Sequence, residues 1–286
     1  MRYHQLRDGQ RRRLAVETED GMCDLTAAKA GLDTFRDLCQ AASVTELPID
    51  EIATRLVDEE NTLSPERFDA ERTDPVTADE IWAAGVTYRI SEEAREEESD
   101  MPEIYLNVYD APRPEIFFKA TPSRTVGPDE AVGIRGDSNW NVPEPELGIV
   151  LYEGDTVGYT IGNDMSSRSI EGKNPLYLPQ AKTYDRSCAI GPGVTTDIED
   201  PHDLSLSMAI YREGECLYEE ATDTGEMIRE CEELVSYFTA HNAVPELTVL
   251  LTGTSLVPED VTLHRGDRID INIEEIGTLS NPVTTV

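Results

Sequence analysis

Apolar residues recur along most of this chain at the spacing of β-strands. Side chains of a strand point alternately to opposite faces of a sheet, so short apolar or alternating runs predict strands. We expect strands at 116–118, 147–152, 156–162, 204–211, 247–251 and 269–276. One segment differs, because apolar residues three and four positions apart predict an amphipathic helix over 225–240.

The first 74 residues are predicted to form a small N-terminal domain. Apolar segments at 14–16 and 22–25 flank Asp20-Gly21, a pair that favours a tight hairpin turn. Helices are expected at 33–42 and 65–72. This unit would be a small α/β domain that precedes the rest of the chain.

A second segment begins at Asp74-Pro75. Thr77 and Glu80 have the spacing of a capping box, which predicts a short helix ending at Gly85. The charged stretch 89–99 predicts an exposed helix. Strands do not alternate regularly with helices further on, so a doubly wound parallel sheet is not expected. The pattern predicts an α+β fold, with a mixed, mostly antiparallel β-sandwich roll over residues 75–286 behind the N-terminal domain over residues 1–74.

Charge excludes two classes of partner. The 286 residues include 58 acidic and 24 basic side chains, which gives a net charge of −34. A nucleic-acid binder needs a basic face, and an anionic membrane surface repels this chain, so neither partner is expected. The acid is spread over the whole length, which is typical of salt-adapted, halophilic proteins. Only four residues are lysine: Lys29, Lys119, Lys173 and Lys182.

Cysteine usage and hydropathy favour a cytoplasmic protein. The five cysteines are scattered, and none forms a CxxC pair, as expected of reduced thiols in the cytosol. No apolar run approaches the ~20 residues that span a bilayer. The N-terminal stretch lacks the apolar region of a secretory signal.

Candidate chemistry lies in one predicted hairpin. Glu144 and Glu146 are two residues apart on a segment kept extended by prolines, so both side chains point to one face. If the loop is the three residues 153–155, Tyr152 pairs with Thr156 and Glu144 lies opposite Asp164, with Cβ atoms roughly 5 Å apart. A two-residue loop would break this parity. Three converging carboxylates suit Mg²⁺, Mn²⁺ or Ca²⁺; the alternative is three ordinary surface acids.

Several motifs carry a resemblance to a known family. The stretches are PEPELGIVL, GYTIGNDMSSRS, the lysine of PQAKTYD, IGPG and LTGTSLVP. Over about residues 75–286 the chain resembles the fumarylacetoacetate hydrolase superfamily, and within it the archaeal dehydratases of 2-keto-3-deoxy sugar acids. The resemblance implies a β-sandwich roll behind a smaller N-terminal domain. It also implies that Glu144, Glu146 and Asp164 hold the metal, and that the chain forms a homodimer or homotetramer.

The resemblance assigns further roles. Glu115 and Lys182 would be the catalytic acid–base pair, with a surface acid and a plain salt bridge as the bland alternatives. Lys119, Lys182, Thr254 and Ser91 are assigned to substrate binding. A structural ion pair is the alternative for Lys119, and a simple turn residue is the alternative for Thr254. Arg168 is expected to brace the turn at Asp164 rather than to touch substrate.

One departure from the family separates two reactions. Family hydrolases carry a loop whose His and Glu activate water, whereas here Ser91 and Ala94 occupy those positions. The resemblance therefore implies a Mg²⁺-dependent dehydratase, a hydro-lyase that converts a 2-keto-3-deoxy-pentonate to 2,5-dioxopentanoate in the degradation of D-xylose or L-arabinose. Two alternatives stay open: a metal-dependent acylpyruvate-type C–C bond hydrolase, and a non-enzymatic scaffold whose carboxylates bind cations.

Overall fold

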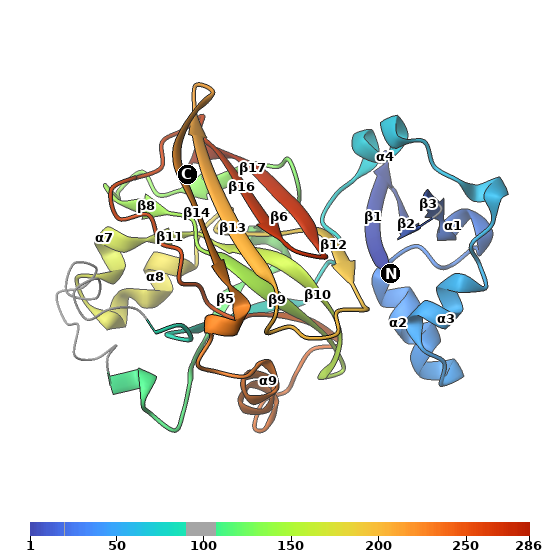
Figure 1. The fold of residues 1–286 in the computed structure, drawn as a ribbon, viewed down its shortest axis with the longest axis horizontal. Coiled ribbons are helices and arrows are strands. Elements are labelled where there is room, and N and C mark those ends of the chain that lie inside the picture. The colour runs from blue at the N-terminus through green and yellow to red at the C-terminus, as the bar shows by residue number, and fades with distance from the viewer. Residues whose placement is uncertain (20, 90–106) are drawn as a thin grey trace.

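The computed structural model describes residues 1–19, 21–89 and 107–286 (Figure 1). Figure 1 shows the N-terminal unit in blue at one side and a larger, strand-rich body at the other. The predicted helix at 89–99 falls almost entirely outside the described residues. Among the described residues, no helix combines the length and the apolar character needed to cross a bilayer.

The N-terminal unit packs helices against a short antiparallel meander. Its elements are β1 (Arg2–Asp8), β2 (Arg11–Thr18), β3 (Gly21–Asp24), α1 (Leu25–Ala28), α2 (Phe35–Thr45), α3 (Ile49–Thr54), η1 (Glu59–Asn61) and α4 (Pro65–Glu71). The predicted β2–β3 hairpin is confirmed, and so are the two predicted helices, which are α2 and α4. Thr34 and Asp37 form a capping box at the start of α2, which satisfies backbone N–H groups there.

One long sheet joins both parts of the molecule. Its order is β3-β2-β1-β12-β10-β9-β15-β4-β5, with β6 (Thr125–Val126) beside β12. Later in the chain, this sheet contains β4 (Glu80–Gly85), β5 (Glu115–Ala120), β9 (Pro145–Tyr152), β10 (Asp155–Asp164), β12 (Cys188–Thr195) and β15 (Leu247–Leu251). The N-terminal strands enter this sheet through two residue pairs of β1 with β12. A domain boundary at residues 74 and 75 stays a prediction.

A second sheet packs against the first. Its order is β14 (Glu215–Asp223), β13 (Ser205–Arg212), β16 (Arg268–Ile273), β17 (Gly277–Thr285) and β7 (Val132–Ile134). Buried apolar side chains from both sheets, such as Leu147, Ile149, Leu206 and Ile271, form one core cluster. Most strand pairs are antiparallel, and β4–β15, β6–β12 and β7–β17 are parallel. The predicted mixed, mostly antiparallel β-sandwich is confirmed.

Short elements surround the sandwich. They are η2 (Pro122–Arg124), the two-stranded sheet of β8 (Asn141–Val142) and β11 (Ser166–Ser167), α7 (Arg168–Glu171), η3 (Pro175–Tyr177), α8 (Leu178–Lys182), η4 (Thr224–Glu226) and α9 (Cys231–Thr239). In Figure 1, α7 and α8 lie together at one end of the strand-rich body.

One helix prediction was wrong, and another was confirmed over a shorter range. The predicted helix that ends at Gly85 is strand β4, because its apolar residues pair with β15 on one side and β5 on the other. The hydroxyl of Thr77, expected to cap that helix, instead binds Arg12 and Asp74. The helix expected over 225–240 begins only at Cys231, because Met227 forms a β-bridge with Tyr88.

Candidate active site

The predicted carboxylate cluster comes from the hairpin of β9 and β10. Its turn holds two residues, Glu153 and Gly154, and Tyr152 pairs with Asp155. The predicted pairing of Tyr152 with Thr156 is therefore wrong. Both turn residues have positive φ, as the common two-residue hairpin turn requires.

A β-bulge restores the register that the shorter turn would have lost. Val157 is left unpaired where the register of β10 shifts, and beyond it the residue numbers of each pair add to 308, as predicted. Gly162 thus pairs with Glu146. The backbone N–H of Asp164 donates to the Glu144 carbonyl at 2.9 Å. Asp164 consequently lies opposite Glu144. The turn is one residue shorter than expected, and the extra residue in β10 at the bulge makes up the difference.

The hairpin brings three carboxylates into one buried cluster. Glu144, Glu146 and Asp164 are 5%, 1% and 1% exposed. Each offers an oxygen that lies within 4.8 Å of the others. An all-oxygen donor set is what Mg²⁺, Mn²⁺ and Ca²⁺ prefer in proteins. The donor chemistry and the burial therefore fit a hard divalent cation.

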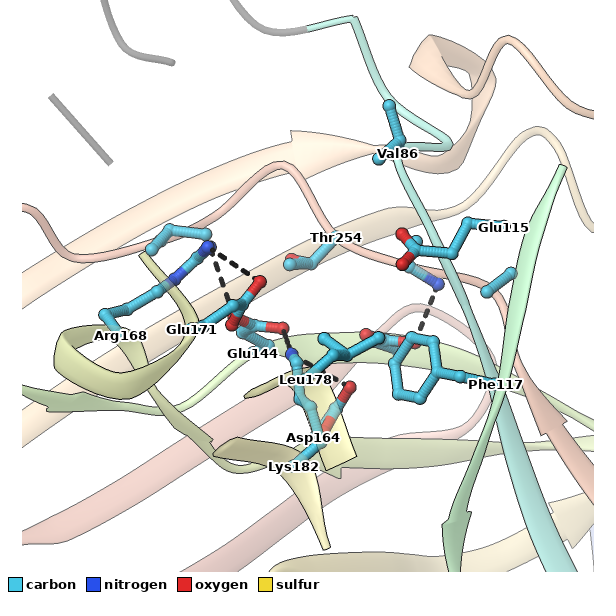
Figure 2. Close-up of a pocket in the computed structure, with 15 residues that line it drawn as sticks. Val86, Glu115, Phe117, Glu144, Asp164, Arg168, Glu171, Leu178, Lys182 and Thr254 are labelled. Carbon is cyan, nitrogen blue, oxygen red and sulfur yellow. Dashed lines mark hydrogen bonds and ion pairs between the residues drawn. The ribbon is translucent and has the colours of Figure 1, made fainter. Parts of the chain in front are cut away.

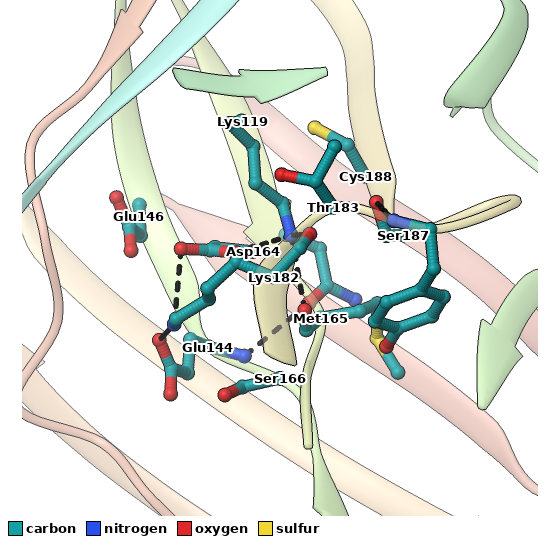
Figure 3. Close-up of polar contacts among 12 residues, drawn as sticks. Lys119, Glu144, Glu146, Asp164, Met165, Ser166, Lys182, Thr183, Ser187 and Cys188 are labelled. Atoms are coloured by element: carbon teal, nitrogen blue, oxygen red, sulfur yellow. Dashed lines mark hydrogen bonds and ion pairs between the residues drawn. The ribbon is translucent and has the colours of Figure 1, made fainter. Parts of the chain in front are cut away.

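Two cationic side chains face the cluster (Figures 2 and 3). The ammonium of Lys182 contacts Glu144 and lies 3.1 Å from Asp164 Oδ2. Arg168 Nη2 lies 3.2 Å from Glu144 Oε1, and Nη1 lies 3.5 Å from Glu171 Oε1. The structure thus places Arg168 against Glu144, where the sequence suggested a brace for Asp164.

Burial and crowding change the proton affinities of these groups. Burial raises the pKa of Glu146 well above its usual value, and Asp164 and Glu144 raise it further. A hydrogen bond of 2.6 Å from the Gly253 N–H offsets this only in part. Burial alone would lower the pKa of Lys182, but the Asp164 and Glu144 carboxylates hold that pKa well above its usual value. Lys182 is therefore protonated, and a bound cation would relieve Glu146 in particular.

Glu115 reaches the same cavity because of the glycine beside it. The cavity is lined by residues that include Glu115, Phe117, Lys182 and Thr254 (Figure 2). Glu115, the first residue of β5, pairs with Gly85, the last residue of β4. A Cβ atom at Gly85 would overlap Glu115 Oε2. The missing side chain at position 85 thus makes the space that the carboxylate occupies.

Thr254 and Leu178 complete the lining at the rim. Thr254 follows β15, and its hydroxyl accepts a hydrogen bond of 3.1 Å from the Leu256 N–H. Leu178 begins α8 and also lines the cavity. Thr254 therefore has a role in its turn and also faces the cavity.

One residue that the sequence assigned to substrate binding does not line the cavity. Lys119 is fully buried, with Nζ 2.5 Å from Asp164 Oδ1, and it is not among the described residues that line the cavity (Figure 3). It lies behind Asp164. Ser91, together with Ala94, lies outside the described residues.

Sequence reasoning missed two contributors to the site. Glu171 lines the cavity and accepts a hydrogen bond of 2.8 Å from Ser166 Oγ, but it is one of 58 acids and had no distinguishing pattern. Gly253 supplies the N–H that binds Glu146 and has a φ of +89°. The Thr-Gly-Thr turn around Gly253 was a signal that could have found it.

The matching family fits this fold and site. Residues 80–284 match the fumarylacetoacetate (FAA) hydrolase C-terminal family, which covers most of the chain. The chain belongs to this family.

The chain is also similar to individual proteins of known name. The chain is 61% identical over its full length to a probable 2-keto-3-deoxyxylonate dehydratase of Haloferax volcanii, of which it covers 100%. It is 45% identical to a 2-dehydro-3-deoxy-D-arabinonate dehydratase of Saccharolobus solfataricus, over 74% of each chain. Among solved structures, a 2-keto-3-deoxy-D-arabinonate dehydratase complexed with magnesium and 2,5-dioxopentanoate superimposes with a TM-score of 0.85, at 33% identity, over 100% of this chain and 99% of that one.

Proposed function

We propose that this protein is a Mg²⁺-dependent hydro-lyase that removes water from a 2-keto-3-deoxy-pentonate and yields 2,5-dioxopentanoate. The observation that carries the proposal is the buried triad of Glu144, Glu146 and Asp164, in one cavity with Lys182 and Glu115. Relatives named for this activity, which align with the whole chain, support it.

The three carboxylates are the proposed metal ligands. Mg²⁺ is the cation proposed, and Mn²⁺ or Ca²⁺ is compatible with the same oxygen donors. When bound, the cation would supply Lewis-acid polarisation of the substrate's C2 carbonyl, which makes the C3 hydrogens more acidic.

Carboxylates outnumber cationic side chains at the site. Five carboxylates and three cationic side chains give a formal charge of −2, and a divalent cation would bring it to zero. These groups are Glu115, Glu144, Glu146, Asp164, Glu171, Lys119, Lys182 and Arg168. The charge of the site therefore favours a divalent cation.

Two side chains are proposed to move protons. Glu115 accepts a proton from C3, and Lys182, held protonated by its neighbours, donates a proton to the C4 hydroxyl as it leaves as water. The C4–O bond breaks and a C3=C4 double bond forms. A proton then shifts from C5 to C3, and the resulting C5 enol becomes an aldehyde as C4 takes up a proton. The net change is the loss of one water molecule.

The remaining assignments concern binding and context. Thr254 is proposed to donate its hydroxyl hydrogen to the substrate carboxylate at the cavity rim. The dispersed acid supports a halophilic, cytoplasmic enzyme, and family resemblance supports a homodimer or homotetramer. Light scattering in concentrated KCl would measure the assembly directly. The sugar acid is proposed to come from oxidative pentose degradation.

The test is a coupled assay. Purified protein in high salt is given 2-keto-3-deoxy-pentonate and Mg²⁺, and the aldehyde product is oxidised by an NAD(P)-linked aldehyde dehydrogenase. We expect Mg²⁺-dependent reduction of the nicotinamide and its loss after chelation. No aldehyde, together with release of pyruvate from acylpyruvates, would reject the dehydratase in favour of a hydrolase. No turnover of either substrate would favour the scaffold.

A further inference from the structure

Lys119 is a fully buried cation of this site that the proposed chemistry does not use. It comes from β5, the strand that also supplies Glu115 and Phe117 to the cavity. Its side chain is 0% exposed. A buried lysine is rare unless its charge is matched, so its surroundings indicate what it does.

A β-bulge directs this side chain. Phe118 pairs with Trp82 and Ala120 pairs with Ile81, so β5 has one residue more than β4 at this point, and that residue is Lys119. Bulges change the direction of a side chain relative to its strand. Here the bulge coincides with the single charged residue inside the strand, since Glu115 stands at its first position.

Three oxygen atoms surround the ammonium, as many as it has hydrogens. They are Asp164 Oδ1 at 2.5 Å, the Met165 carbonyl at 3.0 Å and the Lys182 carbonyl (Figure 3). The two carbonyl contacts are hydrogen bonds and the Asp164 contact is an ion pair, so the ammonium is directed at protein oxygens and not at the cavity. The expectation that Lys119 binds substrate therefore does not fit its contacts.

These contacts join the two halves of the site. Asp164 ends β10, whereas Lys182 ends α8, where helix carbonyls lack intrahelical partners. The ammonium of Lys182 in turn reaches Asp164 Oδ2 at 3.1 Å. Asp164 is thus held between two lysines, one in front and one behind.

We propose that Lys119 is a positioning residue that fixes Asp164 and Lys182 relative to each other, and so sets the geometry of the metal site. This inference rests on the proposed function, since it treats Asp164 as a metal ligand. Groups that orient metal ligands typically change affinity or activity 10–100-fold when removed.

The experiment replaces the charge and keeps the bulk. Lys119→Met is compared with Lys29→Met, the same change at an exposed lysine of the N-terminal unit. Titration calorimetry of metal-free protein with Mg²⁺, without substrate, should show affinity weakened about 10–100-fold in Lys119→Met only. At saturating Mg²⁺, kcat should fall while KM stays within about twofold. Unchanged Mg²⁺ affinity, or a rise in KM alone, would overturn the proposal.

A second variant covers loss of folding. If Lys119→Met does not fold, the double variant Lys119→Met/Asp164→Asn removes both buried charges. Recovered folding supports the action of Lys119 through Asp164, and no recovery argues against it. Failure of the wild-type protein to bind Mg²⁺ would instead reject the proposed function. Wild-type Mg²⁺ binding without dehydration would reject only the reaction, and the effect of Lys119 on affinity would still be measurable.

Discussion

Two hairpins of this molecule have the same turn in opposite surroundings. β9–β10 turns at Glu153-Gly154 and β13–β14 turns at Glu213-Gly214, and all four residues have positive φ. Each hairpin also has one irregularity in register close to its turn. The local chemistry that starts the two hairpins is therefore equivalent.

Their neighbours differ. β9 is buried along its whole length between β10 and β15, whereas β14 is an edge strand with mostly exposed residues. In the first hairpin a slip of one residue would turn Asp164 away from the glutamates, since successive side chains of a strand face opposite ways. In the second hairpin such a slip exposes or buries little. The turn sets the residue pairing of each hairpin. The burial of the strands determines how much a change in that pairing would disrupt.

A one-residue insertion should produce the largest difference in activity between variants of the two hairpins. One alanine between Thr160 and Ile161 moves Asp164 out of register with Glu144, and we expect Mg²⁺ binding and dehydration to be abolished. One alanine between Glu219 and Glu220 should leave both within about twofold, because edge strands tolerate irregularity. Calorimetry and the coupled assay measure the two outcomes. Equal loss in both variants would show that the comparison is wrong.

A charge deletion should affect function and stability in opposite directions. Glu146→Gln removes a proposed ligand, so Mg²⁺ affinity and activity should fall at least 100-fold. It also removes a buried carboxylate whose pKa is raised by burial and by two neighbouring acids. Relief of about 1 kcal/mol should raise the Tm of metal-free protein by about 2–4 °C. Glu219→Gln on the exposed hairpin is the control and should change neither; a lower Tm in Glu146→Gln would contradict this account.

A methyl group in the cavity lining tests the position of Glu115. Gly85→Ala adds a Cβ that overlaps Glu115 Oε2, so kcat should fall roughly 10²-fold through loss of proton transfer. Mg²⁺ affinity should stay unchanged, because the triad lies on other strands. In the control variant Gly136→Ala, the new Cβ makes only ordinary contacts at 3.4 Å, and kcat should be unaffected. A normal kcat in Gly85→Ala would remove Glu115 from the mechanism.

The smallest expected effect is on thiol reactivity. Cys216 lies exposed on β14, whereas Cys188 is buried on β12 beside β10. Burial raises the pKa of Cys188 to about 12, so its thiol stays protonated and unreactive from pH 8 to pH 9. A maleimide should label one of the five cysteines, Cys216, with activity unchanged. Peptide mass spectrometry identifies the site, and labelling of Cys188 in folded protein would show that the buried hairpin opens.

Strands with a mostly apolar run were predictable, and polar β14 was not. β9 and β15 consist mostly of apolar residues and are buried throughout, which is typical of core strands. β14 carries glutamates and a cysteine on exposed positions and has no apolar signal. β4 was mistaken for a helix because its strand state is determined by β15, which is remote in sequence, and not by local spacing.

The residues of the site also differ in how well the sequence predicted their contacts. Glu144, Glu146 and Asp164 belong to one hairpin, so the two-residue period of strands and an assumed turn length are enough to bring them together. The expected loop was one residue too long, and the bulge at Val157 compensated for that error. The two carbonyls that bind Lys119 are 46 and 63 residues away, on elements whose packing no local pattern describes.

The three internal cations, Lys119, Lys182 and Arg168, have a consequence for how the protein is made. They balance most of the buried negative charge from within the chain. Small zinc domains, by contrast, are unfolded until their ion arrives, because the ion supplies the folding energy. Here the chain can fold before it binds the cation. A chelator should therefore abolish activity and leave the circular dichroism spectrum native. Loading is then a separate, reversible step of maturation.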